Sequence, residues 1–345
     1  MNKSAPLLFL LLGFVGSFSY AAAPAESLQP YEASQGAMTI TRGGDLADPY
    51  FALKAFWVLG HERSGSLAVP EPAAALKFMT WLLPFQQADG SFGRYCKEAA
   101  GWKSCKRSDA DDVLTALWVY CVLRYAPDQA LWNQSAGRAL LQLLRLWDPE
   151  RQVFRLFANA PDALLIDNLE IVELLASILK PTALKRLSAS EPALGTNPLW
   201  PLTSTITPSR LRAGMEKTFG IRFAVNPYAE RLASPGHLPG VHFYPHLVGP
   251  TYVWAANLQP LAAAAPFWRS WWSLAGSAWL NMEADEYPWA LVALAAHSLD
   301  KKALQQWQTA VCQQRTAARW TVLDEAVWLR VGNAQRCRPA ADKKS

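Results

Sequence analysis

The sequence predicts an all-α protein, an (α/α)6 toroid of about six helical hairpins with one long irregular insertion. Apolar helices, expected to be buried on most sides, alternate along the chain with amphipathic helices. Five of the six apolar helices begin near a carboxylate, which suits the free N–H groups of a first helical turn. No stretch is rich in strand-forming residues. The pattern therefore indicates an inner and an outer ring, with inner helices starting at a common mouth near Asp48, Asp111, Asp167, Pro250, Glu286 and Asp324.

The first 21 residues have the form of a cleaved secretory signal. Lys3 gives a positive end, residues 6–15 are apolar, and small residues stand at Ser19 and Ala21. The apolar run is shorter than the roughly 20 residues of a membrane span, and no later stretch is long and apolar enough. We therefore expect a periplasmic or secreted protein with no transmembrane segment.

The rest of the chain divides into a lead-in and one domain. Residues 22–44 are expected to be extended, and residues 45–338 to form a single toroid. Prolines and glycines dominate residues 181–249, which we interpret as an irregular insertion with one short helix. Insertions of this length are often binding loops or lids.

The individual helices follow from apolar spacing and from caps. Asp48-Pro49 gives the first helix a cap and a proline in its first turn. Asp167-Asn168 opens another, where Asn168 is expected to satisfy backbone groups. The remaining helices are expected at 72–85, from 109, at 129–147, 208–219, from 250, at 267–280, 286–297, 301–315 and 324–330.

Composition favours a large core and argues against some partners. The chain is 51% hydrophobic and 18% charged, with a net charge of +5. Its basic residues are scattered, so no nucleic-acid surface is expected. Sixteen tryptophans exceed what a core requires, and Trp102, Trp200, Trp254 and Trp289 fall near the expected mouth, where indoles could support sugar rings. The oligomeric state is left open.

The five cysteines predict two disulfides in an exported protein. Cys96 is expected to pair with Cys105, and Cys312 with Cys337, which leaves Cys121 as a buried thiol. The five histidines do not stand at ligand spacings to these cysteines, so neither a metal nor another cofactor is expected.

Short motifs resemble two families of α/α toroids. Residues 81–92, with Gln86, resemble the glutamine–tryptophan repeats of squalene–hopene cyclases, and Asp109-Ala110-Asp111-Asp112 resembles the Asp-x-Asp-Asp acid of class II terpene cyclases. Ser108-Asp109-Ala110-Asp111 also resembles the Ser-Asp-Ala-Asp of family-eight glycoside hydrolases. That family includes the periplasmic endoglucanase that accompanies bacterial cellulose synthesis.

Two further segments resemble the second family, and one departs from it. Residues 243–250, which include Tyr244, are similar to its Phe-Asn-Pro-Ser-Tyr-Leu-x-Pro stretch, and residues 285–289 loosely resemble the segment that carries its catalytic base. The family's acid is the glutamate of a Ser-Glu-Gly-Gln motif, for which this chain has Ala33-Ser34-Gln35-Gly36. Glu32, Asp45 and Asp48 are the possible substitutes for it.

A ring of carboxylates at the mouth suits glycoside hydrolysis, which needs one protonated and one ionised carboxyl across the bond. Asp111, Asp48 and Asp285 are the catalytic candidates. Asp112 and Asp324 are expected to be helix caps only. The candidate substrate-binding residues are Asp109, Asp167, Trp102, Trp254, Tyr244, Glu286 and Trp289.

Three functions remain open at this point. The first is an exported glycoside hydrolase or lyase acting on a bacterial polysaccharide or oligosaccharide. The second is a non-catalytic toroid that binds a glycan or a protein partner in an exopolysaccharide or export system, which the missing Ser-Glu-Gly-Gln motif favours. The third is a terpene-cyclase-like enzyme, which would need an apolar pocket below its acid.

Overall fold

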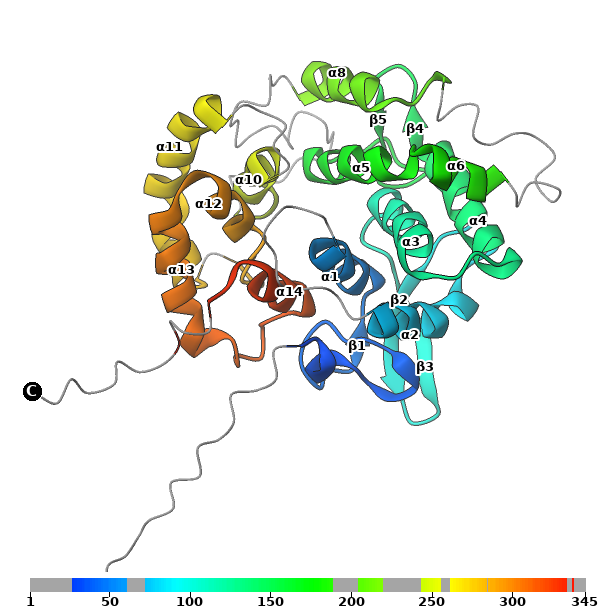
Figure 1. The fold of residues 1–345 in the computed structure, drawn as a ribbon, viewed down its shortest axis with the longest axis horizontal. Coiled ribbons are helices and arrows are strands. Elements are labelled where there is room, and N and C mark those ends of the chain that lie inside the picture. Colours follow the sequence, from blue (N-terminus) through cyan, green and yellow to red (C-terminus); the bar gives the residue numbers. More distant parts are fainter. Residues whose placement is uncertain are drawn as a thin grey trace, which may run out of the picture.

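A computed structural model describes residues 27–60, 72–188, 204–219, 243–255, 261–283, 285–333 and 337 (Figure 1). The expected signal peptide at 1–21 lies outside these residues, as do Trp200 and much of the expected insertion at 181–249. Among the described residues, no helix combines the length and the apolar character that crossing a bilayer requires.

The inner helices form a closed ring. Each contacts the next, and the last contacts the first, so that the ring returns on itself (Figure 1). This arrangement confirms the expected α/α toroid. In order around the ring, the inner helices are α1 (Pro49–Gly60), α3 (Asp111–Tyr125), α5 (Leu165–Ile178), α10 (Val248–Ala255), α12 (Val292–Leu299) and α14 (Val322–Val331).

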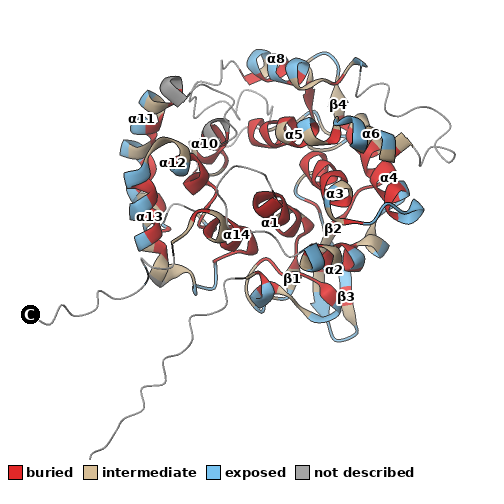
Figure 2. Ribbon diagram, in the orientation of Figure 1, coloured by how far each residue is buried: buried red, intermediate tan, exposed pale blue. Residues whose placement is uncertain are grey.

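The outer helices surround this ring. Inner helices are buried over most of their length, whereas outer helices have an exposed face (Figure 2). The helix at 208–219 was expected, but α6 falls where the sequence suggested irregular chain. The outer helices are α2 (Pro72–Leu82), α4 (Ala130–Leu146), α6 (Pro181–Ser188), α8 (Pro208–Phe219), α11 (Leu261–Leu280) and α13 (Lys301–Gln314).

Residues 27–44, expected to be extended, contain two 3-10 turns, η1 (Gln29–Tyr31) and η2 (Ser34–Gly36). Tyr31 is buried, and η2 contacts α2. Thr41 forms a β-bridge with Thr321, directly before α14. This segment thus packs between α2 and the start of α14 and completes the outer layer there.

A three-stranded antiparallel sheet stands between α2 and α3. Its order is β1 (Leu46–Ala47), β2 (Gly93–Glu98) and β3 (Gly101–Arg107), and the disulfide Cys96–Cys105 joins β2 to β3. The sequence suggested only a loop here. A second sheet, β4 (Trp147–Asp148) with β5 (Val153–Phe154), matches the turn and short extended piece expected after α4. Two short turns complete the described elements, η3 (Leu83–Phe85) and η5 (Phe243–Leu247).

The inner helices start at one end of the ring, as expected. The pairing of β1 with β2 joins the segments that lead into α1 and α3. The Asp111 N–H donates to the Leu156 carbonyl (2.9 Å), and the Phe154 N–H donates to Asn168 Oδ1 (2.7 Å), which links α3 to α5. The Ala290 N–H donates to Asp324 Oδ1 (2.8 Å) and links α12 to α14.

Several expected helix boundaries differ, among them the start of α11, expected at 267 and found at Leu261. The helix expected from Glu286 begins at Val292, because residues 285–290 form turns in which Trp289 has a left-handed φ of 52°. The helix expected from Asp324 begins at Val322, where Thr321 and Asp324 form a capping box. Asp324 is therefore a cap, as the sequence suggested.

Most tryptophans lie in the core, contrary to the expectation of a surplus. Among those that the structure describes, eleven are buried. On the α11–α13 side, Trp268 stacks on Trp271, and Trp279 stacks on Trp307 with ring centroids 6.2 Å apart. The disulfide Cys312–Cys337 is also present, and Cys121 is a buried thiol, both as expected.

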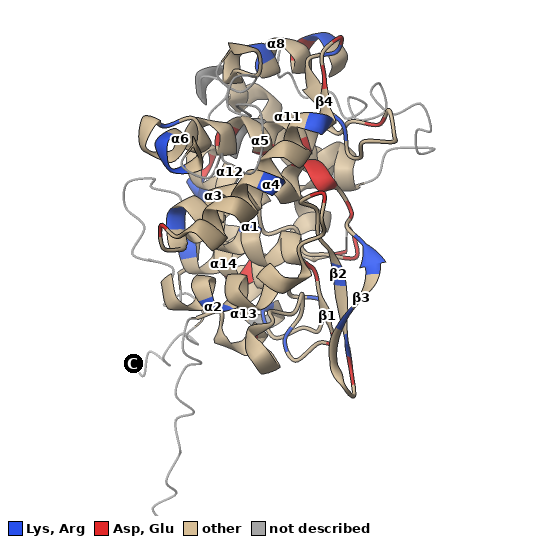
Figure 3. Cartoon of the chain, turned by 90° about the vertical axis from the view of Figure 1, so that its right-hand side faces the viewer, with Lys and Arg blue, Asp and Glu red and all other residues tan. Residues whose placement is uncertain are grey.

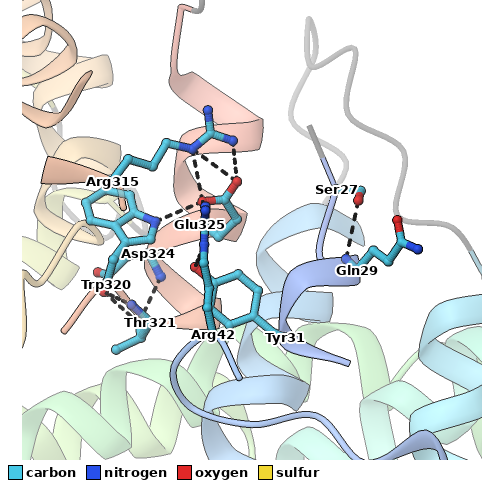
Figure 4. Close-up of polar contacts among 9 residues, drawn as sticks. All are labelled: Ser27, Gln29, Tyr31, Arg42, Arg315, Trp320, Thr321, Asp324 and Glu325. Atoms are coloured by element: carbon cyan, nitrogen blue, oxygen red, sulfur yellow. Dashed lines mark hydrogen bonds and ion pairs between the residues drawn. The ribbon is translucent and has the colours of Figure 1, made fainter. Parts of the chain in front are cut away.

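A buried polar cluster closes the ring between the lead-in and α14 (Figure 4). Glu325, 1% exposed, accepts hydrogen bonds from Arg315 and from Trp320 Nε1 (2.9 Å). Arg42 reaches the same carboxylate (3.2 Å) and also donates to the Tyr31 hydroxyl (3.3 Å). The two ends of the toroid are therefore held by charge-assisted hydrogen bonds.

Candidate functional site

Asp48 and Asp109 are brought together at the mouth by one arginine. Asp48 precedes α1, and its Oδ1 accepts the Tyr50 N–H (3.0 Å), which caps the helix. Arg94 of β2 places Nε 2.9 Å from Asp48 Oδ2 and Nη2 2.5 Å from Asp109 Oδ1. Asp48 is buried, whereas the Asp109 side chain is 80% exposed.

Asp48 has the protonation behaviour of a weak acid working near neutral pH. Burial raises the pKa of its carboxyl to about 6, although Arg94 and the Tyr50 N–H oppose this rise. The negative charge of Asp109 adds to it. A carboxyl with this pKa is part protonated and part ionised close to neutrality.

An aromatic wall stands beside these carboxylates. Tyr244 of η5 and Trp289 stack with ring centroids 4.3 Å apart, and Tyr287 lies edge-on to Trp289 at 6.2 Å. The Tyr287 ring also contacts Phe51 of α1 at 5.3 Å. The wall therefore adjoins the helix start that Asp48 caps. Faces of this kind can hold the apolar side of a sugar ring.

Asp285 is anchored to the wall. Its Oδ2 accepts the Tyr244 N–H (3.2 Å), and its Oδ1 accepts the N–H of Glu286 (2.5 Å), whose side chain is exposed. The Trp289 indole nitrogen is buried and has no hydrogen-bond acceptor among the residues that the structure describes. A ligand hydroxyl could serve as that acceptor.

Asp111 is the first residue of α3 and lines a cavity. Ser108 Oγ donates to its Oδ1 (2.5 Å), and Arg107 Nη2 lies 3.6 Å from its Oδ2. Burial raises the pKa of its carboxyl, against both of these partners. The cavity, of about 500 Å³, lies against the β2–β3 hairpin and is also lined by Asp89.

Asp112 and Asp167 are also buried. Asp112 Oδ1 accepts the Val113 N–H (2.8 Å), and burial raises the pKa of the carboxyl to about 8. Asn168, next to Asp167, bonds both the N–H and the carbonyl of Phe154, so it satisfies backbone groups as expected.

The structure adds a charged group that sequence reasoning missed. Lys54 of α1 and Glu170 of α5 form an ion pair of 2.7 Å, with side chains 0% and 1% exposed. The Tyr50 hydroxyl donates to Glu170 (3.0 Å), and Lys54 Nζ lies over the rings of Trp57 and Tyr252. A lysine inside the apolar α1 sequence was the available signal.

The expected tryptophan platforms differ in position. Trp289 lies in the aromatic wall, whereas Trp102 is buried and packs edge-on against Trp81. Trp254 belongs to α10, and its side chain lies outside the described residues. No group of His, Cys, Asp and Glu in the described part of the chain is arranged to hold a metal ion.

Comparison with known proteins assigns no family. No family model matches the chain, and a search of curated proteins finds no match. Among solved structures, Rex8A from Paenibacillus barcinonensis, complexed with xylose, is similar with a TM-score of 0.49 and 12% identity. That likeness covers 90% of this chain and 88% of Rex8A.

Proposed function

We infer that this chain is an exported carbohydrate-active protein that binds a polysaccharide at the mouth of the toroid and cleaves it by glycoside hydrolysis. The observation that carries this proposal is the buried Asp48 carboxyl, with a pKa of about 6, beside the aromatic wall of Tyr244, Tyr287 and Trp289. Protonated carboxyl groups donate to the leaving oxygen of a glycosidic bond, while stacked aromatic rings hold sugars in place.

In this proposal Asp48 is the general acid and Asp285 the general base. Asp48 gives its proton to the glycosidic oxygen as the bond to the anomeric carbon breaks. Asp285 takes a proton from the water that attacks that carbon. Asp109 and Asp111 bind sugar hydroxyls, with Asp111 expected to be essential. Glu286, Asp167 and Trp254 remain proposed substrate contacts, whereas Trp102 is not retained because it is buried against Trp81.

Export is supported by the two disulfides, Cys96–Cys105 and Cys312–Cys337, because such bonds persist mainly in oxidising compartments. The sequence of residues 1–21 adds the form of a cleaved signal. We propose a periplasmic or secreted location on these two grounds.

A non-catalytic glycan-binding toroid is the second candidate. It is favoured by the turn that replaces the Ser-Glu-Gly-Gln motif, where Gln35 has a left-handed φ of 66° and an exposed side chain near Gly101. The Arg94 guanidinium also favours the ionised form of Asp48. The terpene-cyclase alternative is disfavoured by the charged Lys54–Glu170 pair, since a cyclase requires an apolar interior.

The test uses the protein without residues 1–21 and a panel of β-linked glucans and exopolysaccharides. New reducing ends report hydrolysis, and ultraviolet absorbance of an unsaturated product reports elimination. Asp48→Asn and Asp285→Asn should each lower kcat by at least about 100-fold, the usual contribution of general acid–base catalysis. Glu98→Gln, which removes an exposed carboxylate paired with Lys103, is the control.

The pH profile separates the roles. Because Asp48 must be protonated to act as the acid, activity should fall as pH rises through about 6. An unchanged kcat in Asp48→Asn would remove this residue from the mechanism. No product from the parent protein, together with retention of the glycan in affinity electrophoresis, would establish the binding function instead.

A further inference from the structure

A second cavity lies at the end of the ring away from the mouth. Its volume is about 490 Å³, within the range of ligand sites. The walls include Gly60, Tyr120 and Ser177, near the C-terminal ends of α1, α3 and α5. These helices have 12 to 15 residues, so at 1.5 Å per residue the cavity lies roughly 20 Å from their starts.

The charged side chains that line this cavity are all positive. Arg124, Lys180 and Arg186 line it, and no acidic residue is among the described residues of its wall. Ser177 and Thr182 add hydroxyl groups. In Figure 3, α6 lies on the side of the molecule opposite the β2–β3 hairpin and carries basic residues. The combination of cations and hydroxyls differs from that at the mouth, where carboxylates predominate.

Arg186 forms the fixed part of the wall. Its guanidinium donates to Asn133 Oδ1 (2.8 Å), to the Val122 carbonyl (3.2 Å) and to the Pro127 carbonyl (2.7 Å). Asp128 lies 3.5 Å away, but its side chain is 70% exposed. Burial lowers the pKa of Arg186 despite this carboxylate. The guanidinium is therefore short of compensating negative charge.

Arg124 and Lys180 are exposed and stand on two different elements, the last turn of α3 and the residue before α6. Thr182 follows in the first turn of α6, where backbone N–H groups are not used by the helix itself. Phosphate and carboxylate oxygens accept hydrogen bonds from cationic side chains, from hydroxyl groups and from free N–H groups.

We propose that this cavity binds the anionic group, a phosphate or a carboxylate, of a small ligand the size of a modified sugar. Arg124 and Lys180 contact the anion, Ser177 and Thr182 donate hydrogen bonds, and the Tyr120 side of the wall accommodates the uncharged part. This inference stands independently of glycoside hydrolysis at the mouth.

The test is calorimetric titration of the intact protein without residues 1–21. The probes are inorganic phosphate, glucose 6-phosphate and glucuronate, with glucose as the neutral control and ionic strength held constant. Arg124→Gln and Lys180→Gln should each weaken binding about tenfold or more, as the loss of a charge-assisted hydrogen bond does. Lys185→Gln, an exposed cation of α6 that is not in the wall, should leave binding unchanged.

Saturable binding of glucose 6-phosphate but not of glucuronate would identify a phosphate ligand. Saturable binding of glucuronate but not of glucose 6-phosphate would identify a carboxylate ligand. Absence of saturable binding for all three anions would overturn the inference. An equal loss in Lys185→Gln would also overturn it, because the effect would then be one of general charge. Since no glycan is hydrolysed in this assay, its result is separate from that of the mouth experiment.

Discussion

The Lys54–Glu170 pair inside the ring offers a direct test of the packing described above. Glu170→Gln removes the paired carboxylate of Lys54 Nζ, 2.7 Å away, from a lysine side chain that is 0% exposed, and leaves only the more weakly acting Glu173 and Asp167. The amide oxygen of Gln can still accept from the Tyr50 hydroxyl, so that hydrogen bond adds no cost. Breaking one side of a buried ion pair typically costs about 3–5 kcal/mol.

Because aromatic rings surround Lys54, we expect the loss in free energy of unfolding to lie near the lower end of this range. Lys54 Nζ lies 4.4 Å from the Trp57 centroid and 5.0 Å from that of Tyr252. Each cation–π contact is worth about 0.5–2 kcal/mol and is retained in the variant. We therefore expect a loss of about 3 kcal/mol, measured by urea unfolding at pH 7 with tryptophan fluorescence.

Two controls accompany this measurement. The double variant Lys54→Met with Glu170→Leu should recover most of the loss, because apolar side chains can replace a buried pair. Lys77→Gln breaks the pair with Glu32, in which the side chains are 56% and 24% exposed, and should cost less than about 1 kcal/mol. A Glu170→Gln loss no larger than that of Lys77→Gln would refute the reasoning.

The effect of Lys54 on folding stability depends on pH with a defined sign. Burial lowers the pKa of Lys54 below its usual 10.5, so the unfolded chain holds this proton to a higher pH than the folded chain. Stability contributed by this group therefore rises as pH increases from the folded towards the unfolded pKa. Because Glu170 opposes the shift, the rise in stability should begin at a lower pH and be larger in total in Glu170→Gln.

Three further predictions concern unfolding by urea. Burial raises the Asp112 pKa from 3.8 to about 8, so the free energy of unfolding falls as pH rises across that interval. Asp112→Asn should reduce this fall. An unchanged dependence of stability on pH in the variant would contradict the prediction. Gly90→Ala should cost more than Gly43→Ala, because both have positive φ but only at Gly90 would a Cβ overlap the Arg138 carbonyl; equal losses would exclude the overlap. Asn168→Ala should cost more than about 2 kcal/mol, since buried backbone partners lose their bonds; a loss below 1 kcal/mol would show that water replaces them.

The ring of helices could be predicted from the sequence, but the β2–β3 hairpin could not. Helix starts such as Asp48 and Asp111 were recoverable because caps and apolar runs are local signals. The β2–β3 hairpin was missed because residues 103–107 of β3 are polar and exposed, without the alternation of a half-buried strand, and the alternation in β2 covers only residues 93–96. It is held instead by pairing with β1 and by the disulfide Cys96–Cys105.

The site was predicted less completely because its contacts join distant segments. Arg94 links Asp48 to Asp109, and nothing in the hairpin sequence indicated that role. Tyr244 and Asp285 were both identified as candidates, but their contact depends on how η5 packs beside the segment before α12. Lys54 and Glu170 were missed because each looks unpaired in its own helix.

The closure of the ring has a consequence for how the molecule folds. The Arg42–Glu325 contact joins residues 283 positions apart, and Arg330 donates to the Val58 carbonyl across 272 positions. Contacts of this separation incur a large loop-closure entropy and slow folding. Because α14 is the last inner helix to be synthesised and closes the ring against α1, the ring must remain an open arc until Val331 has been made. We expect a long-lived, incompletely closed intermediate, in which Tyr31 and its neighbours stay exposed until α14 docks.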